Sequence, residues 1–117
     1  MDILESEVLE FIESFKQNDR EIELFFLTGG NSYYFAIILQ ERFNHCGLIM
    51  YNPDIHQFYY KIIGNMYYIC GKVLDEEKIK VSEPWSIYKN KDIKEEAEII
   101  ANDIMKIPEE KINKIIP

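Results

Sequence analysis

The stretch that decides the fold runs from Thr28 to Phe43 and reads TGGNSYYFAIILQERF. Its Gly29-Gly30 pair marks a turn, and Asn31 and Ser32 are residue types that often cap the first turn of a helix. The run after them has almost no polar side before Gln40, which is typical of a helix buried on nearly every side. We therefore predict a turn capped by Asn31 or Ser32 that leads into a central buried helix.

Three candidate strands follow this helix along the chain. The first spans Cys46–Tyr51 and ends at the turn composition NPD of residues 52–54. The second spans Ile55–Ile63, where large apolar residues recur at every other position, and the third spans Met66–Val73. Because Gly64-Asn65 separates them, the last two should form a tight hairpin. The expected fold is α+β, with the buried helix packed on a small antiparallel meander of three or more strands.

A helix is also expected before this core. Apolar residues recur at helical spacing from Ile3 to Phe15, and Asp2 with Glu5 has the form of a capping box. The short apolar stretch Ile22–Leu27 that follows is compatible with a strand or with extended chain.

The part of the chain after the meander is more polar. Residues 75–78, DEEK, are expected to form a surface loop, and helical spacing returns in Lys91–Ile107 until Pro108 breaks it. We expect a single domain over 1–117, with a core at about 22–88 and a C-terminal helical segment at 91–116. The apolar positions of the 91–107 helix are Ile93, Ala97, Ile100, Ala101 and Ile104.

Charge and composition exclude several classes of protein. The 117 residues include 13 basic and 21 acidic side chains, which gives a net charge of -8. Such a chain repels phosphate backbones, so direct binding to nucleic acid is not expected, whereas a basic nucleic-acid-binding enzyme is a fitting partner. The N-terminus lacks the basic start of a signal peptide, and no apolar run approaches the roughly 20 residues that span a bilayer. We expect a cytoplasmic protein without membrane contact.

The two cysteines do not suggest a metal or redox site. Cys46 and Cys70 show no C-x-x-C spacing, so we expect two free, buried thiols. His45 lies beside Cys46 without the ligand spacing of a zinc site. No metal and no cofactor are expected.

The segment Gly30–Ala36, GNSYYFA, resembles the nucleophile turn of the papain-like cysteine hydrolase superfamily, including its NlpC-type and phage-encoded members. In that family the turn reads Gly-Asn-Cys-Tyr-x-Phe-Ala, and the resemblance extends over Gly29–Val73. The resemblance implies a cysteine nucleophile at the start of the buried helix, where helix N–H groups lower the thiol pKa. It further implies a histidine base at the start of the second strand and a polar residue on the third strand that orients it.

The chain departs from the family at all three catalytic positions. Ser32 stands in place of the cysteine, Gln57 in place of the histidine, and Tyr68 in place of the orienting aspartate. His56 lies one residue before the family position, which on a strand points a side chain to the opposite face. A serine hydroxyl needs a base more than a thiol does, so we expect a catalytically degenerate pseudoenzyme. The alternatives are a cryptic hydrolase or acyl-transfer enzyme that uses Ser32 with His56, and a structural subunit that self-associates through its C-terminal helices.

Tyrosines are concentrated on the predicted hairpin. Adjacent strand residues alternate between the two faces of a sheet, so we expect half of them in the core and half exposed as a protein-binding surface. Ordinary cross-strand packing is the alternative. The residues are Tyr59, Tyr60, Tyr67 and Tyr68, with Tyr33 at the start of the buried helix.

These expectations combine into one functional hypothesis. The chain is expected to act by binding another macromolecule through an acidic or tyrosine-rich surface. Its richness in Ile, Lys, Asn and Glu is typical of an AT-rich bacterial or phage genome. By analogy with the small phage and mobile-element proteins of the family, the expected role is that of an inhibitor or anti-defence factor.

Overall fold

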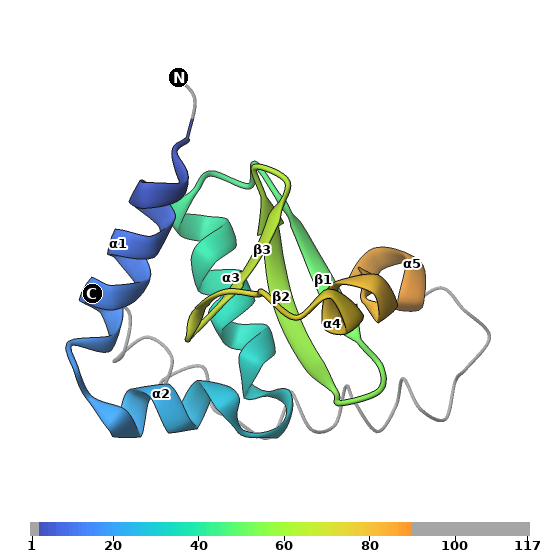
Figure 1. Ribbon diagram of the computed structural model, residues 1–117, viewed down its shortest axis with the longest axis horizontal. Coiled ribbons are helices and arrows are strands. Elements are labelled where there is room, and N and C mark those ends of the chain that lie inside the picture. Colours follow the sequence, from blue (N-terminus) through green and yellow to red (C-terminus); the bar gives the residue numbers. More distant parts are fainter. Residues whose placement is uncertain (1–2, 90–117) are drawn as a thin grey trace.

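Three helices precede an antiparallel sheet in the computed structural model, which describes residues 3–89 (Figure 1). The predicted C-terminal segment 91–116 lies outside the described residues. The helices before the sheet are α1 (Glu5–Lys16), α2 (Arg20–Leu27) and α3 (Ser32–Arg42), and a 3-10 turn, η1 (Gly29–Asn31), leads into α3. The elements after α3 are β1 (Leu48–Asn52), β2 (Gln57–Ile62), β3 (Asn65–Tyr68), β4 (Gly71–Lys72), α4 (Glu76–Val81), β5 (Glu83–Pro84) and α5 (Trp85–Lys89).

The five strands form one antiparallel sheet in the order β4-β3-β2-β1-β5. The α+β class and the antiparallel meander are therefore confirmed. The hairpin turn lies one residue earlier than predicted, because Ile62 pairs with Asn65 and the loop is Ile63-Gly64. Both loop residues have positive φ, 58° and 76°, which suits the twist of a two-residue hairpin. The predicted third strand, Met66–Val73, is wrong as a single strand, because the chain turns back after Tyr68 and β4 pairs antiparallel with β3.

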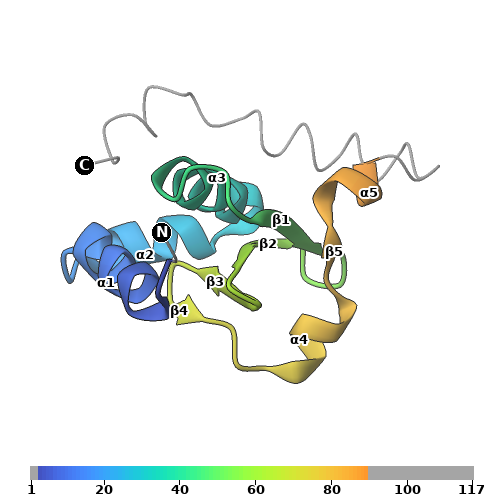
Figure 2. The ribbon, with the colours of Figure 1, turned by 90° about the horizontal axis from the view of Figure 1, so that it is seen from above.

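Helix α3 packs against one face of this sheet, as the view from above shows (Figure 2). Its side chains Phe35, Ile38 and Leu39 are buried in the same cluster as Phe58 and Tyr60 of β2. Helices α1 and α2 extend that cluster through three phenylalanine rings whose centroids lie 5.2–5.7 Å apart. These rings are those of Phe15, Phe26 and Phe35.

The opposite face of the sheet carries a second, smaller cluster. Met50, Tyr59, Met66 and Val73 are buried there, and the chain through α4 passes on this side (Figure 2). The centre of the sheet is therefore covered on both faces. This explains why consecutive residues of β2 are buried where simple alternation would leave every second one exposed.

Two short helices replace segments that were expected to be irregular or extended. The stretch Ile22–Leu27 belongs to α2, and the expected loop at residues 76–78 belongs to α4. An aspartate precedes each helix as its N-cap residue, and its carboxylate accepts a hydrogen bond from the N–H two residues later, at 2.9 Å for Asp19 and 3.0 Å for Asp75. Each of these hydrogen bonds satisfies a free N–H at the start of its helix.

The start of α1 also differs from the expectation. Its N-cap residue is Leu4, and no side chain caps it. The capping box expected of Asp2 and Glu5 is therefore absent from the described start of the helix, and Glu5 forms an ion pair with Lys72 of β4 at 3.2 Å. This pair joins the N-terminal helix to the edge of the sheet.

The described helices were compared with the length and hydrophobicity that a membrane span needs. Among residues 3–89, no single helix is both long enough and apolar enough to cross a membrane. Helices α2 and α3 meet both conditions only when taken together, across a bend of 107°.

Candidate functional site

Ser32 lies at the first turn of α3, against the start of β2. It is 3% exposed, and its Oγ accepts a hydrogen bond from the backbone N–H of Phe58 at 2.9 Å. The expectation that Asn31 or Ser32 caps the helix through its side chain is wrong, because no side-chain cap bond is present. Asn31 instead donates from Nδ2 to the carbonyl oxygen of Phe25 at 2.9 Å. Both polar side chains thus connect segments of the core.

His56 is not a base for Ser32 in this structure. It lies in the turn between β1 and β2 with a positive φ of 52°, and its side chain is exposed. Its Nδ1 is hydrogen-bonded to the hydroxyl of Tyr51 at 2.6 Å. No hydrogen bond joins Ser32 and His56 among the described residues, so the pair expected of a cryptic hydrolase is not formed.

Gln57 and Tyr68, which stand at the other two family positions, lie away from Ser32. Gln57 Oε1 accepts a hydrogen bond from the Tyr59 hydroxyl at 2.6 Å, so its side chain lies on the same face of β2 as Tyr59, opposite to α3. Tyr68 packs edge-on against Tyr59, with ring centroids 5.6 Å apart. None of the three candidate partners is placed to activate the Ser32 hydroxyl.

The tyrosines of the hairpin belong mainly to the interior. Tyr59, Tyr60 and Tyr67 are each at most 1% exposed, so the expectation that half of the four hairpin tyrosines are exposed is wrong. Tyr68 and Tyr33 are half-buried and pack against the clusters on the two faces. Since the sheet is covered on both sides, the alternative of ordinary packing describes the hairpin better.

The buried hydroxyls of Tyr59 and Tyr60 are hydrogen-bonded, and burial raises the pKa of both phenols. The backbone N–H of Gly47 donates to the Tyr60 hydroxyl oxygen at 2.7 Å. Burial raises the pKa of Tyr59 to about 12, and the neighbouring Tyr68 adds to the shift. A phenol with such a pKa stays neutral in the physiological range, so Tyr59 is suited to hold the fold together and not to exchange protons.

The cysteines are exposed, which corrects the expectation of buried thiols. Both are free. Cys70 Sγ donates to the Glu23 carboxylate at 3.3 Å, and desolvation together with that carboxylate raises the pKa of the thiol. Such a thiol is a poor nucleophile. Within residues 3–89, no three His, Cys, Asp or Glu side chains gather in a way that would hold a metal ion.

The strongest electrostatic feature is the helical hairpin formed by α1 and α2, residues 5–27. It carries seven acidic and two basic residues, whereas residues 28–89 carry six of each. The whole acidic excess of the described chain is therefore concentrated on this hairpin. The carboxylates whose side chains are exposed are Glu7, Glu10, Glu13, Asp19 and Glu21. The net charge was predicted from the sequence, but the concentration of acidic residues on residues 5–27 was not. It becomes visible once α2 is recognised as a helix.

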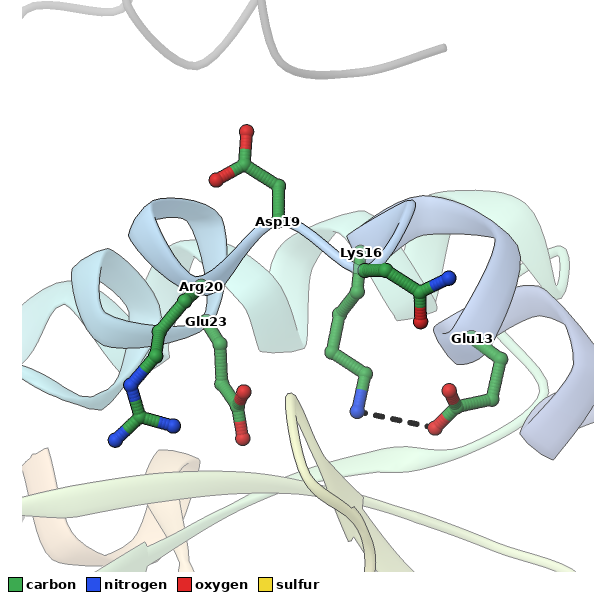
Figure 3. Close-up of a pocket in the computed structure, with 6 residues that line it drawn as sticks. Glu13, Lys16, Asp19, Arg20 and Glu23 are labelled. Carbon is green, nitrogen blue, oxygen red and sulfur yellow. Dashed lines mark ion pairs between the residues drawn. The ribbon is translucent and has the colours of Figure 1, made fainter.

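A cavity of about 250 Å³ lies at the elbow between α1 and α2 (Figure 3). Lys16 projects into it with a side chain only 13% exposed, and its Nζ pairs with Glu13 at 3.0 Å. The Arg20 and Glu23 side chains extend side by side, while Asp19 points away from them (Figure 3). Acidic and basic side chains thus lie next to each other around the cavity, so it does not present a surface of a single charge sign.

Comparison with known proteins adds no identification. No protein-family model, no curated protein and no solved structure matches this chain.

Proposed function

We propose that this chain is a non-catalytic, papain-like-fold protein that acts by binding a basic protein through its acidic hairpin, residues 5–27. The observation that carries the proposal is the charge segregation: seven acidic against two basic residues on α1 and α2, and equal numbers elsewhere in the described chain. Complementary charge steers two proteins together and restricts the choice of partner.

The lack of catalysis is supported by how the candidate nucleophile is used. The Ser32 oxygen is buried and accepts the Phe58 N–H, and the imidazole of His56 is engaged with Tyr51. A serine nucleophile needs a base within hydrogen-bond reach. The papain-like assignment rests on the order of parts, a glycine turn, a buried helix and an antiparallel meander, and on the Gly30–Ala36 resemblance.

The partner class follows from the sign and place of the charge. A basic nucleic-acid-binding enzyme presents a groove built for phosphates, and a row of carboxylates on a helix can compete for it. Inhibition of such an enzyme by a phage or mobile-element protein is the role that we propose. It is argued from charge and from the family analogy, since fold alone does not determine function.

The test uses the full-length chain and two matched double variants. Glu7→Gln with Glu10→Gln removes two charges from α1, and Glu76→Gln with Glu77→Gln removes two from α4; all four side chains are exposed. Partners are captured from host lysate and identified, and each complex is then reconstituted from purified proteins. We expect the α1 variant to weaken the complex by roughly tenfold, as surface charge pairs of about 0.5–1 kcal/mol each imply.

Further outcomes distinguish this proposal from the alternative functions. Raising the salt concentration, or adding heparin as a phosphate mimic, should release the partner. Equal weakening by the α1 and α4 variants would place the interface elsewhere. A complex insensitive to salt would rule out the charge mechanism, and capture of only the chain itself would indicate a self-associating structural subunit.

A further inference from the structure

Another cavity, of about 300 Å³, lies between α3, the start of β1 and α5. Strand β5 leaves this space open because it is short. Only Met50 and Tyr51 of β1 pair with β5, so among residues 3–89 no strand lies beside Leu48 and Ile49 on that edge of the sheet. Cavities that hold small ligands have volumes of about 300–1,000 Å³, so this one has room for a single small molecule. We call it the α3–α5 cavity.

One face of α3 forms a wall of the α3–α5 cavity. Tyr33, Ile37 and Gln40 line it, and their i, i+4, i+7 spacing places them in a row on one side of the helix. At 1.5 Å of rise per residue, Tyr33 and Gln40 are about 10 Å apart along the helix axis. The wall therefore presents an aromatic ring at one end and an amide at the other.

The aromatic end is built from two rings that are held in place. Trp85 of α5 also lines the cavity, and its ring centroid lies 6.4 Å from that of Tyr33. Both rings pack edge-on against Phe58, at 5.0 Å for Tyr33 and 4.9 Å for Trp85. Burial raises the pKa of Tyr33, so its hydroxyl stays protonated and uncharged at neutral pH. A fixed, neutral pair of rings is suited to stacking against a planar aromatic group.

The amide end is oriented by a chain of hydrogen bonds. Gln40 Nε2 lies 3.0 Å from His45 Nδ1, and His45 Nε2 lies 3.2 Å from a carboxylate oxygen of Glu41. The carboxylate favours the tautomer with a proton on Nε2, so Nδ1 accepts a hydrogen bond from the Gln40 amide. The second N–H of this amide and its Oε1 have no other partner within residues 3–89. They remain for a ligand.

The α3–α5 cavity carries no charge of its own. No Asp, Glu, Lys, Arg or His side chain lines it among the described residues, although the whole chain has a net charge of -8. A phosphate or carboxylate placed here would lose its hydration without gaining a cation, in the negative field of the protein. An ammonium group would likewise find no carboxylate in the wall. The lining therefore selects an uncharged ligand.

We propose that the α3–α5 cavity binds an uncharged nucleoside. A nucleoside has a planar aromatic base at one end and neutral ribose hydroxyls at the other, which matches the two ends of the α3 wall. The base stacks on Tyr33 and Trp85, as unpaired bases do on aromatic side chains. The ribose hydroxyls donate and accept, so they pair with the Oε1 and N–H of Gln40. The cavity is lined outside the acidic hairpin, residues 5–27, so this proposal does not depend on the proposed function.

The test is titration of the full-length protein with adenosine and with uridine. Trp85 is the only tryptophan of the chain, so its emission reports on the cavity. The NMR shifts of the backbone amides of Gly47 and Ser86, which also line the cavity, provide an independent readout. We expect saturable changes in both signals with at least one nucleoside. Adenosine monophosphate should bind about tenfold more weakly than adenosine, because its phosphate finds no cation.

Four variants locate the bound nucleoside. Tyr33→Leu removes the stacking ring and Gln40→Leu removes the amide, so each should weaken nucleoside binding by about tenfold. Tyr33→Phe keeps the ring and should bind as the wild type does. Tyr34→Leu is the matched control, because Tyr34 is also half-buried at the start of α3 but does not line the cavity. Circular dichroism checks that each variant is folded.

Three results would overturn the proposal. The first is no saturable change in either signal with both nucleosides at millimolar concentration. The second is binding of adenosine monophosphate as tight as that of adenosine, which would contradict an uncharged ligand. The third is equal binding by the wild type, Tyr33→Leu and Gln40→Leu, which would place the nucleoside elsewhere on the protein.

Discussion

The backbone N–H of Phe58 donates a hydrogen bond to the hydroxyl oxygen of Ser32 at 2.9 Å, which joins the first turn of α3 to the start of β2. The two residues are 26 positions apart in sequence, and both are buried. The side chain that resembles a nucleophile therefore acts as an acceptor for the sheet. The following predictions test this relationship and others like it.

Replacing Ser32 with alanine should destabilise the fold. The Phe58 N–H would lose its acceptor inside the core, and a buried unpaired N–H costs about 1–3 kcal/mol. Urea unfolding monitored by circular dichroism measures the change in free energy. Ser14→Ala on the exposed side of α1 is the control and should stay within about 0.5 kcal/mol of the wild type. Equal stability of Ser32→Ala and the wild type would contradict the structural role of the hydroxyl.

Ser32 should not react with a fluorophosphonate probe. Its hydroxyl is 3% exposed and lacks a base, since the His56 imidazole is hydrogen-bonded to Tyr51. Labelling is measured by intact-protein mass spectrometry beside an active serine hydrolase. Stoichiometric labelling that Ser32→Ala abolishes would restore the cryptic-hydrolase alternative.

Gly47→Ala should be more harmful than Gly64→Ala. A Cβ at Gly47 would lie 2.3 Å from the carbonyl oxygen of Lys61 and 2.7 Å from the Tyr60 ring, so backbone must move. A Cβ at Gly64 meets nothing within 4 Å, and the cost there is only that of its positive φ, about 1 kcal/mol. We expect Gly47→Ala to cost at least about 2 kcal/mol in thermal or urea unfolding. A smaller loss than at Gly64 would show that the β1–β2 contact is looser than described.

Stability should fall in strongly alkaline solution through Tyr59. Its pKa is raised to about 12 from 10.0, so between these values the unfolded chain loses the phenolic proton while the folded chain keeps it. Below pH 10 both states are protonated, so stability does not change with pH through this group. Between pH 10 and 12 the free energy of unfolding falls by up to about 3 kcal/mol. Urea unfolding of the wild type and Tyr59→Phe at several pH values isolates this contribution. Identical pH slopes for the two proteins would contradict the shift.

The elements that sequence analysis identified correctly are those with strong local signals. The apolar run after Gly29-Gly30 is α3, and the alternation on both sides of Gly64 is the β2–β3 hairpin. Helix α2 was missed, because the short and mostly apolar stretch Ile22–Leu27 suits a strand as well as a helix, although the Asp19 cap was present in the sequence. Short apolar runs are ambiguous when periodicity alone is used.

The candidate site was harder to predict from the sequence than the secondary structure. Ser32 was singled out from the sequence, but its hydrogen-bond partner is the backbone N–H of Phe58, which no side-chain pattern can reveal. The burial of Tyr59 depends on the second cluster, which brings together Met50 of β1, Met66 of β3 and Val73 after β4.

The sequence by itself determined the class of each strongly periodic element and the excess of negative charge, because periodicity and composition are local properties. Only the tertiary structure decided that the acidic excess lies on one hairpin, that the tyrosines are interior, and that the Ser32 oxygen serves Phe58 and not His56. These outcomes depend on which distant segments meet. The free energy of these tertiary contacts comes from burial of apolar surface and from hydrogen bonds, which no local sequence pattern encodes.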